Sequence, residues 1–202
     1  MAEVQPRYEY RVWADALEEQ KDQLRRLAPA LRTESSEEIY LISLLTDSYN
    51  VKLRSGQIRI KALLAMEQGL ELWKPVLDAD FPLDRALIAD QIFPCFELPA
   101  PVLDRPEYLM EDFFTEIIRP ISQIAILTTF KTRVRFRLNE CLAEFTSVTV
   151  DKARLTTVAV ESIRAEGVLQ LIRELRIDGM PNINYVRRLK QVLENTGLAR
   201  FR

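Results

Sequence analysis

The sequence predicts an α+β fold in which about eight strands form an antiparallel sheet or barrel, with a few helices beside them. Two observations favour this fold. Most segments alternate apolar and polar residues, as strands do, and these segments follow one another directly instead of through crossover helices. At 202 residues we expect a single domain that spans residues 1–202.

The first strands can be placed by alternation and by turn residues. The aromatic-rich segment Arg7–Ala14 is predicted as a strand, after which Asp15 is expected to cap a helix that ends near Pro29. The segment Glu37–Leu45 is a second predicted strand. Two alternating segments around Ser55-Gly56-Gln57 then give the clearest hairpin signal.

The middle of the chain mixes predicted strands and helices. A strand is expected after the turn at Gln68-Gly69, in the segment GLELWKPVL. Helices are predicted over Leu83–Phe96 and over Glu107–Ile118, the second of which ends before Pro120. The segment Ile121–Leu138 is rich in β-branched and aromatic residues and is therefore predicted as a long strand.

The last third is predicted to hold a hairpin and two helices. The strands Cys141–Val150 and Leu155–Ser162 flank a tight turn, and a turn centred on Lys152–Ala153 would place Glu144 opposite Glu161. Amphipathic helices are expected over Glu166–Leu175 and Tyr185–Asn195.

Composition excludes several kinds of chemistry. The chain has no histidine and 2 cysteines. Catalytic triads, a histidine base and metal sites built on imidazole are therefore excluded. Cys95 and Cys141 cannot complete a four-thiolate site and are expected to be buried thiols. Any reaction must use carboxylates, Lys, Arg, hydroxyls and hard metal ions.

Net charge and hydropathy indicate which classes of binding partner to expect. A net charge of −2 argues against a general nucleic-acid binder, so we expect no DNA partner. The N-terminal segment lacks the apolar core of a signal peptide, and the longest apolar segments, such as Ile121–Leu127, are too short to span a membrane. We therefore expect a cytoplasmic protein without membrane contact. The oligomeric state stays open, and a homodimer is compatible with the sequence.

Charged side chains share faces of the predicted strands, because successive residues point to opposite faces. A charged face on any single strand could simply be the solvent-exposed outer face of a sheet. Such outer faces usually mix positive and negative residues, however, and like charges close together repel unless an anion lies between them. We therefore favour a surface or lumen that binds a polyanion through Arg and Lys, with carboxylates that hold Mg²⁺ or Mn²⁺. These faces carry the basic residues Arg7, Arg11, Lys52, Arg54, Arg59, Lys61, Lys131, Arg133, Arg135 and Arg137 and the acidic residues Glu9, Glu144 and Glu161.

The chain resembles the CYTH superfamily, the triphosphate tunnel metalloenzymes, from about Arg7 to Leu193. That group includes class IV adenylate cyclases, thiamine and inorganic triphosphatases, and fungal-type RNA triphosphatases. The resemblance implies an eight-stranded antiparallel β-barrel with flanking helices, whose charged lumen grips a triphosphate and binds divalent metal. It rests on the order and spacing of RYEYRVW, NVKLRSGQIRIK, GLELWKP, FKTRVRF, AEFTSV, LTTVAVES and PNINYVRRL.

The resemblance also implies roles for single residues. Catalytic roles fall to Glu9, Arg11 and Lys61. The metal ligands, for Mg²⁺ or Mn²⁺, would be Glu9, Glu144 and Glu161. The triphosphate or polyphosphate would be held by Lys52, Arg54, Arg59, Lys131, Arg133 and Arg135.

Two departures from the family pattern concern the carboxylates. The opening motif Glu-x-Glu-x-Lys reads Arg7-Tyr8-Glu9-Tyr10-Arg11, and a later Glu-x-Glu pair reads Ala159-Val160-Glu161. The family's basic residue near the last helix has no clear match, although Asn184 is nearby. A cation at position 7 disfavours a metal ion close to it.

Two functions that use the charged faces remain open, beside a third possibility, a structural module whose barrel faces only water or a protein partner. The first is a metal-dependent phosphohydrolase that acts on inorganic, nucleoside or thiamine triphosphate, with an adenylate cyclase as a variant. The second is a non-catalytic domain that binds or senses polyphosphate or nucleotide. Glu144 and Glu161 favour the first, and the missing carboxylates at Arg7 and Ala159 favour the second.

Overall fold

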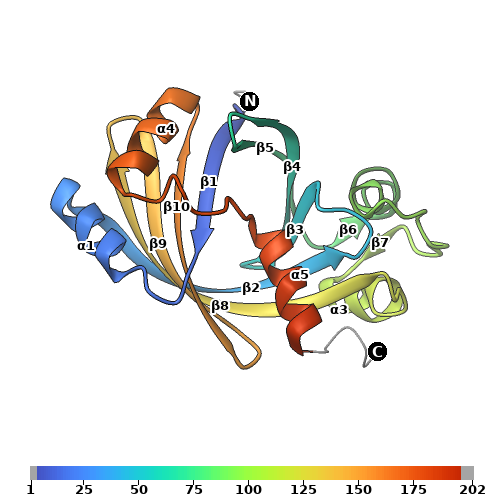
Figure 1. Ribbon diagram of the computed structural model, residues 1–202. Coiled ribbons are helices and arrows are strands. Elements are labelled where there is room, and N and C mark those ends of the chain that lie inside the picture. Colours follow the sequence, from blue (N-terminus) through green and yellow to red (C-terminus); the bar gives the residue numbers. More distant parts are fainter. Residues whose placement is uncertain (1–3, 197–202) are drawn as a thin grey trace. The chain divides into compact units, whose positions relative to one another are not determined.

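A closed antiparallel β-barrel of eight strands is the main feature of the computed structural model, which describes residues 4–196 (Figure 1). The strands are joined in the order β1-β10-β9-β8-β2-β3-β4-β5. The predicted α+β class and the eight-stranded barrel are thereby confirmed. The barrel strands are β1 (Arg7–Trp13), β2 (Ala30–Ser43), β3 (Tyr49–Arg54), β4 (Gln57–Glu67), β5 (Leu70–Asp80), β8 (Ile124–Leu138), β9 (Cys141–Val150) and β10 (Ala153–Ser162).

Helices and a short second sheet complete the described chain. Strands β6 (Leu83–Asp84) and β7 (Glu107–Tyr108) pair with each other outside the barrel. None of the helices between residues 4 and 196 is long and apolar enough to cross a membrane. The helical segments are α1 (Glu18–Leu27), α2 (Arg85–Leu87), η1 (Ile88–Ile92), η2 (Phe93–Phe96), α3 (Met110–Asp112), η3 (Phe113–Ile118), α4 (Ala165–Glu174) and α5 (Tyr185–Thr196).

Two compact units share the barrel strands. The division runs through β2, β4, β5 and β8, each of which contributes to both units. The expectation of one domain over residues 1–202 stays a prediction. Unit 1 comprises Met1–Glu37, Leu63–Lys74 and Thr129–Asn184, and unit 2 comprises Glu38–Ala62, Pro75–Thr128 and Tyr185–Arg202.

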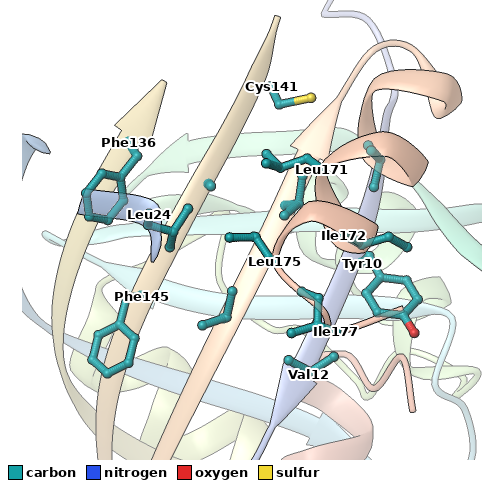
Figure 2. Close-up of a cluster of buried hydrophobic side chains, with 14 of the residues drawn as sticks. Tyr10, Val12, Leu24, Phe136, Cys141, Phe145, Leu171, Ile172, Leu175 and Ile177 are labelled. Carbon is teal, nitrogen blue, oxygen red and sulfur yellow. The ribbon is translucent and has the colours of Figure 1, made fainter. Parts of the chain in front are cut away.

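The core of unit 1 lies between its strands and the helices α1 and α4. Figure 2 shows Phe136 and Phe145 from β8 and β9 beside Leu24 of α1, with Leu171 of α4 in the same cluster. Tyr10 and Val12 extend the cluster along β1. Each large apolar side chain buried here contributes roughly 1.5–3 kcal/mol to folding. Because the helices cover these apolar faces, the opposite, charged faces of the same strands line the barrel interior.

The core of unit 2 also lies between strands and helical segments. Val51 and Leu53 of β3 and Ile58 and Ile60 of β4 pack against the helical segments between residues 85 and 118. The ring of Tyr40 points to the opposite face of β2, where it stacks on Tyr185 of α5 with centroids 5.7 Å apart. Helix α5 therefore covers a polar strand face, unlike the helices over the apolar core.

Tight turns fix the hairpins. Ser55 and Gly56 have φ of 53° and 77° and form a two-residue connection between β3 and β4. The hairpin lies where the sequence predicted it, although Gln57 already belongs to β4. The β9–β10 turn also has two residues, Asp151 and Lys152, so its centre lies one residue earlier than expected. The prediction that Glu144 lies opposite Glu161 is therefore wrong. Glu144 pairs with Ala159, and Glu161 pairs with Leu142.

Several predicted boundaries also move. Helix α1 begins at Glu18 without a side-chain cap, so the capping role of Asp15 is wrong, and β2 begins at Ala30 instead of Glu37. The helices predicted over Leu83–Phe96 and Glu107–Ile118 are broken into short strands and wide or tight helical turns. In the first of these segments Pro94 lacks the N–H that a continuous helix needs.

Candidate anion-binding site

A buried guanidinium connects two carboxylates on the interior face of unit 1. Arg11, only 6% exposed, lies on β1. Its Nε donates to Glu9 Oε1 at 2.9 Å, and its Nη2 donates to Glu144 Oε1 at 3.0 Å. Its Nη1 also donates to Thr157 Oγ1 at 3.4 Å. One side chain therefore joins β1, β9 and β10.

The network continues onto β8 and β2. Arg135 Nη2 lies 3.0 Å from Glu34 Oε1, and its Nε lies 3.9 Å from Glu144 Oε2. Arg133 Nη1 contacts the same Glu34 oxygen at 3.4 Å. Lys131, on the same face of β8, is 2% exposed. Unit 1 therefore gathers three guanidiniums and one ammonium with three carboxylates, which we call the Arg11 cluster: Glu9, Arg11, Glu34, Lys131, Arg133, Arg135 and Glu144.

The charge state of Glu144 follows from these neighbours. Burial alone would raise the pKa of this carboxyl. The positive charges of Arg11, Arg133 and Arg135, together with the hydrogen bond from Arg11, outweigh burial and lower the pKa to about 2. Glu144 is therefore ionised at neutral pH.

The third predicted metal ligand has a different partner. Glu161 Oε1 lies 3.1 Å from Arg7 Nη1, at a partly exposed position. Arg7 is the residue that stands where the family motif has its first glutamate. The carboxylate of Glu161 therefore has the Arg7 guanidinium as its neighbour, where the motif would supply a second carboxylate.

A buried carboxylate on β5 was not predicted. Glu71 is 1% exposed and pairs in register with Glu9 of β1. Its Oε1 accepts a hydrogen bond from Asn184 Nδ2 at 2.8 Å, and its Oε2 accepts one from Trp73 Nε1 at 2.9 Å. In the sequence, Glu71 alternates with Leu70 and Leu72 and so shares a strand face with Trp73. This alternation is the pattern from which Glu71 could have been predicted.

The segment Asn182–Asn184, which we call the strap, fixes the backbone of β1 beside the cluster. Asn182 Oδ1 accepts from the backbone N–H of Arg11 at 2.8 Å, and its Nδ2 donates to the carbonyls of Glu9 and Gly69 at 3.3 and 2.9 Å. The N–H of Ile183 donates to the Arg11 carbonyl at 2.8 Å. Both backbone polar groups of Arg11 are thus occupied by the strap.

A second cluster of charges lies in unit 2. Glu38 is fully buried, and its Oε2 accepts from Tyr40 Oη at 3.1 Å and from Lys52 Nζ at 3.2 Å. Arg54 Nε lies 3.8 Å from Glu38 Oε1. Glu34 was missed because the predicted strand began after it, at Glu37. Glu38 lay inside the predicted strand but was the single charged residue on its face, beside Tyr40 and Ile42.

The remaining predicted residues lie on β4, next to β3. Arg59 pairs in register with Lys52, but its Nε lies 3.5 Å from Asp78 Oδ2. Lys61 pairs in register with Asn50, and its ammonium makes no hydrogen bond or ion pair with the part of the chain that the structure describes. The phosphate-binding and catalytic roles of these residues stay predictions.

A divalent metal does not fit the predicted carboxylates as they are arranged. Among residues 4–196, no three Cys, Asp or Glu side chains gather closely enough to hold a metal ion. Glu9 and Glu144 share the Arg11 guanidinium, and Glu161 pairs with Arg7. Each of these three carboxylates already has a basic partner, which weighs against a metal ion there. Metal binding by Glu9, Glu144 and Glu161 stays an untested prediction.

Comparisons with known proteins give the fold. No protein-family model matches the sequence. No curated protein matches it either. Solved structures do match: the PH1012 protein of Pyrococcus horikoshii OT3 has 16% identity and a TM-score of 0.53 over 89% of this chain and 97% of that chain. A candidate adenylate cyclase of Bacillus halodurans has 14% identity and a TM-score of 0.52 over 92% and 97%.

A third solved structure gives a similar result. HpAC1 of Hippeastrum, a candidate adenylyl cyclase described as having a dominant triphosphatase activity, has 11% identity and a TM-score of 0.51 over 95% of this chain and 96% of that chain. At these identities the likeness shows the fold. The barrel of this chain is thus also the barrel of these cyclase and triphosphatase candidates.

Proposed function

We propose, from the triphosphate-tunnel fold of the CYTH superfamily that the chain shares with these structures, that the protein binds a triphosphate-bearing anion. The observation that carries the proposal is the burial of Arg11, Lys131 and Arg133, which are 6%, 2% and 4% exposed. Lys and Arg are almost never fully buried unless their charge is matched. A cluster of several such side chains on one face is an arrangement suited to phosphate oxygens.

The carboxylates of the cluster balance these cations in the absence of an anion. Glu34 contacts both Arg133 and Arg135, and Glu144 contacts Arg11 and Arg135. A phosphate chain offers more acceptor oxygens than one carboxylate, and a guanidinium can contact two of them at once. Binding therefore exchanges internal ion pairs for contacts to phosphate, at a cost that only a highly charged anion offsets.

The ligand class is inorganic, nucleoside or thiamine triphosphate. The triphosphatase activity described for HpAC1 supports this class. We also propose a cytoplasmic location, which the two free cysteines favour.

A metal-dependent hydrolase is the second candidate, with an adenylate cyclase as its variant. The observation that favours it is that the carboxylates of Glu9, on β1, and Glu144, on β9, both reach the guanidinium of Arg11. A hydrolase would also need Mg²⁺ or Mn²⁺ at these carboxylates, and the arrangement around Arg11 weighs against that.

Thermal unfolding in the presence of tripolyphosphate tests the proposal. We expect saturating ligand to raise Tm by roughly 5–10 °C, because about 3 kcal/mol of binding free energy is gained at 100 times Kd. Arg135→Ala, which removes one guanidinium of the Arg11 cluster, should weaken binding about tenfold. Lys152→Ala, which removes the same charge from an exposed turn, is the matched control and should bind like the wild type.

Two results would decide against the proposal or extend it. If tripolyphosphate, ATP and thiamine triphosphate all leave Tm unchanged, anion binding is wrong. If phosphate is released from any of them with Mg²⁺ or Mn²⁺ and the release is lost in Glu144→Gln, the hydrolase is the correct function.

A further inference from the structure

We propose, resting on the anion-binding function above, that Arg11 is a built-in cation that takes the place of a divalent metal between Glu9 and Glu144. The protein would then bind the metal-free form of its polyphosphate. Glu9 and Glu144, which were predicted to bind a metal ion, both contact the Arg11 guanidinium instead.

The geometry gives Arg11 the position of a shared cation. Its Nε and Nη2 contact carboxylate oxygens from two different strands at 2.9 and 3.0 Å. A divalent ion bound by both carboxylates would need oxygens at about 2.1 Å, in the space that the guanidinium fills. Glu9 and Glu144 therefore cannot hold Arg11 and a metal ion through these oxygens at the same time.

The strap keeps this guanidinium in place. The N–H and carbonyl of Arg11 are bonded to Asn182 and Ile183, and its Nη1 reaches Thr157. A side chain that starts from a fixed backbone and is only 6% exposed cannot move aside without breaking these buried contacts. The cation is thus part of the fold instead of a ligand taken from solution.

The neighbouring charges disfavour a second cation. Arg135 Nε lies 3.9 Å from Glu144 Oε2, and Arg133 contacts the Glu34 oxygen that Arg135 also contacts. A metal ion added here would meet three guanidiniums, whose repulsion grows where water is excluded. A polyphosphate without metal carries more negative charge than its Mg²⁺ complex and suits this cluster better.

Mn²⁺ binding to the protein alone provides the first test. We expect no binding to the wild type by electron paramagnetic resonance at millimolar Mn²⁺. Arg11→Ser frees both carboxylates and is expected to bind Mn²⁺, whereas Arg11→Lys keeps a cation and should not. Arg135→Ser removes a neighbouring charge but leaves Arg11 in place, so this variant is the matched control and should not bind either.

Tripolyphosphate binding to the wild type provides a second test that needs no variant to fold. We expect Kd in excess Mg²⁺ to exceed Kd in EDTA by about tenfold when nine-tenths of the ligand is metal-bound. Tighter binding in Mg²⁺, or wild-type Mn²⁺ binding that disappears in Glu144→Gln, would overturn the inference.

The two proposals fail in different ways. No tripolyphosphate binding in either buffer would overturn the proposed anion-binding function. The exclusion of metal by Arg11 would still be supported if Arg11→Ser alone gained Mn²⁺, and it would be overturned if Arg11→Ser were folded by circular dichroism yet bound none.

Discussion

The pKa of Glu144 reflects the positive charges of the Arg11 cluster around it. Its pKa of about 2 lies below that of an unfolded glutamate, so its ionisation stabilises the folded protein at any pH above about 4.5. This contribution is lost as pH falls through the folded pKa near 2. It amounts to roughly 3 kcal/mol at neutral pH.

Glu144→Gln should therefore change the pH dependence of stability. We expect the variant to lose roughly 3 kcal/mol of unfolding free energy at pH 7, because Arg11 and Arg135 keep their charge without this partner. The difference from the wild type should shrink as pH is lowered from about 4.5 towards 2. Urea unfolding at several pH values measures it, and a difference independent of pH would contradict the assigned pKa.

At the scale of elements, the strap and β1 form one structural unit. Asn182→Ala removes the side-chain contacts to Arg11 N–H and to the carbonyls of Glu9 and Gly69. We expect a loss of about 2 kcal/mol, because partly buried backbone groups lose their side-chain partner. Guanidinium chloride unfolding measures this loss. Asn195→Ala, at an exposed site on α5, is the control, and an equal effect in both variants would argue against a special role for the strap.

Helix α4 approaches the β8–β9 turn closely at Gly167. A Cβ there would lie 3.1 Å from Cys141 Sγ and 3.1 Å from Glu140 Oε1. Gly167→Ala should therefore lower stability by about 1 kcal/mol, although alanine normally favours a helix. Gly179→Ala meets no atom within 4 Å and is the matched control.

A double variant separates crowding from other causes. Cys141→Ala removes the buried sulfur that the new methyl group would meet. If crowding is the cause, Gly167→Ala should cost less in the Cys141→Ala background than in the wild type, by thermal unfolding of all four proteins. Equal costs in both backgrounds would point to another cause.

The elements that sequence predicts best are those whose signal is local. The β3–β4 hairpin follows from alternation and from a glycine that accepts a φ of 77°, and both appear in the sequence. The two central helices were predicted at the right place, but apolar spacing could not show that each is preceded by a two-residue strand and continues in widened or tightened turns. The predicted β9–β10 register was wrong by one residue at the turn centre, because the segment Asp151-Lys152-Ala153-Arg154 does not reveal which two residues lie at its tip.

At the scale of the whole molecule, strand alternation predicted which charged residues share a strand face, and the family resemblance supplied the expectation that these faces line a lumen. Alternation placed Arg11, Lys131 and Arg133 on shared faces, and all three are buried in the barrel. Alternation could not give the acidic partners of these cations. Glu34 lies before the predicted start of β2, and the pairing of Arg11 with Glu144 depends on a contact between strands that are far apart in sequence.

The strap and the pairing of β1 bear on how the chain folds as it leaves the ribosome. β1 pairs with β10, for example at Glu9 and Glu161, and then receives the strap from Asn182. Such distant contacts slow folding, because a long loop must close before they form. β1 precedes the other barrel strands in the chain, yet it stays without most of its partners until β10 and the strap have been synthesised. Completion of the barrel is thus a late event, and β1 is the segment that a chaperone would have to protect.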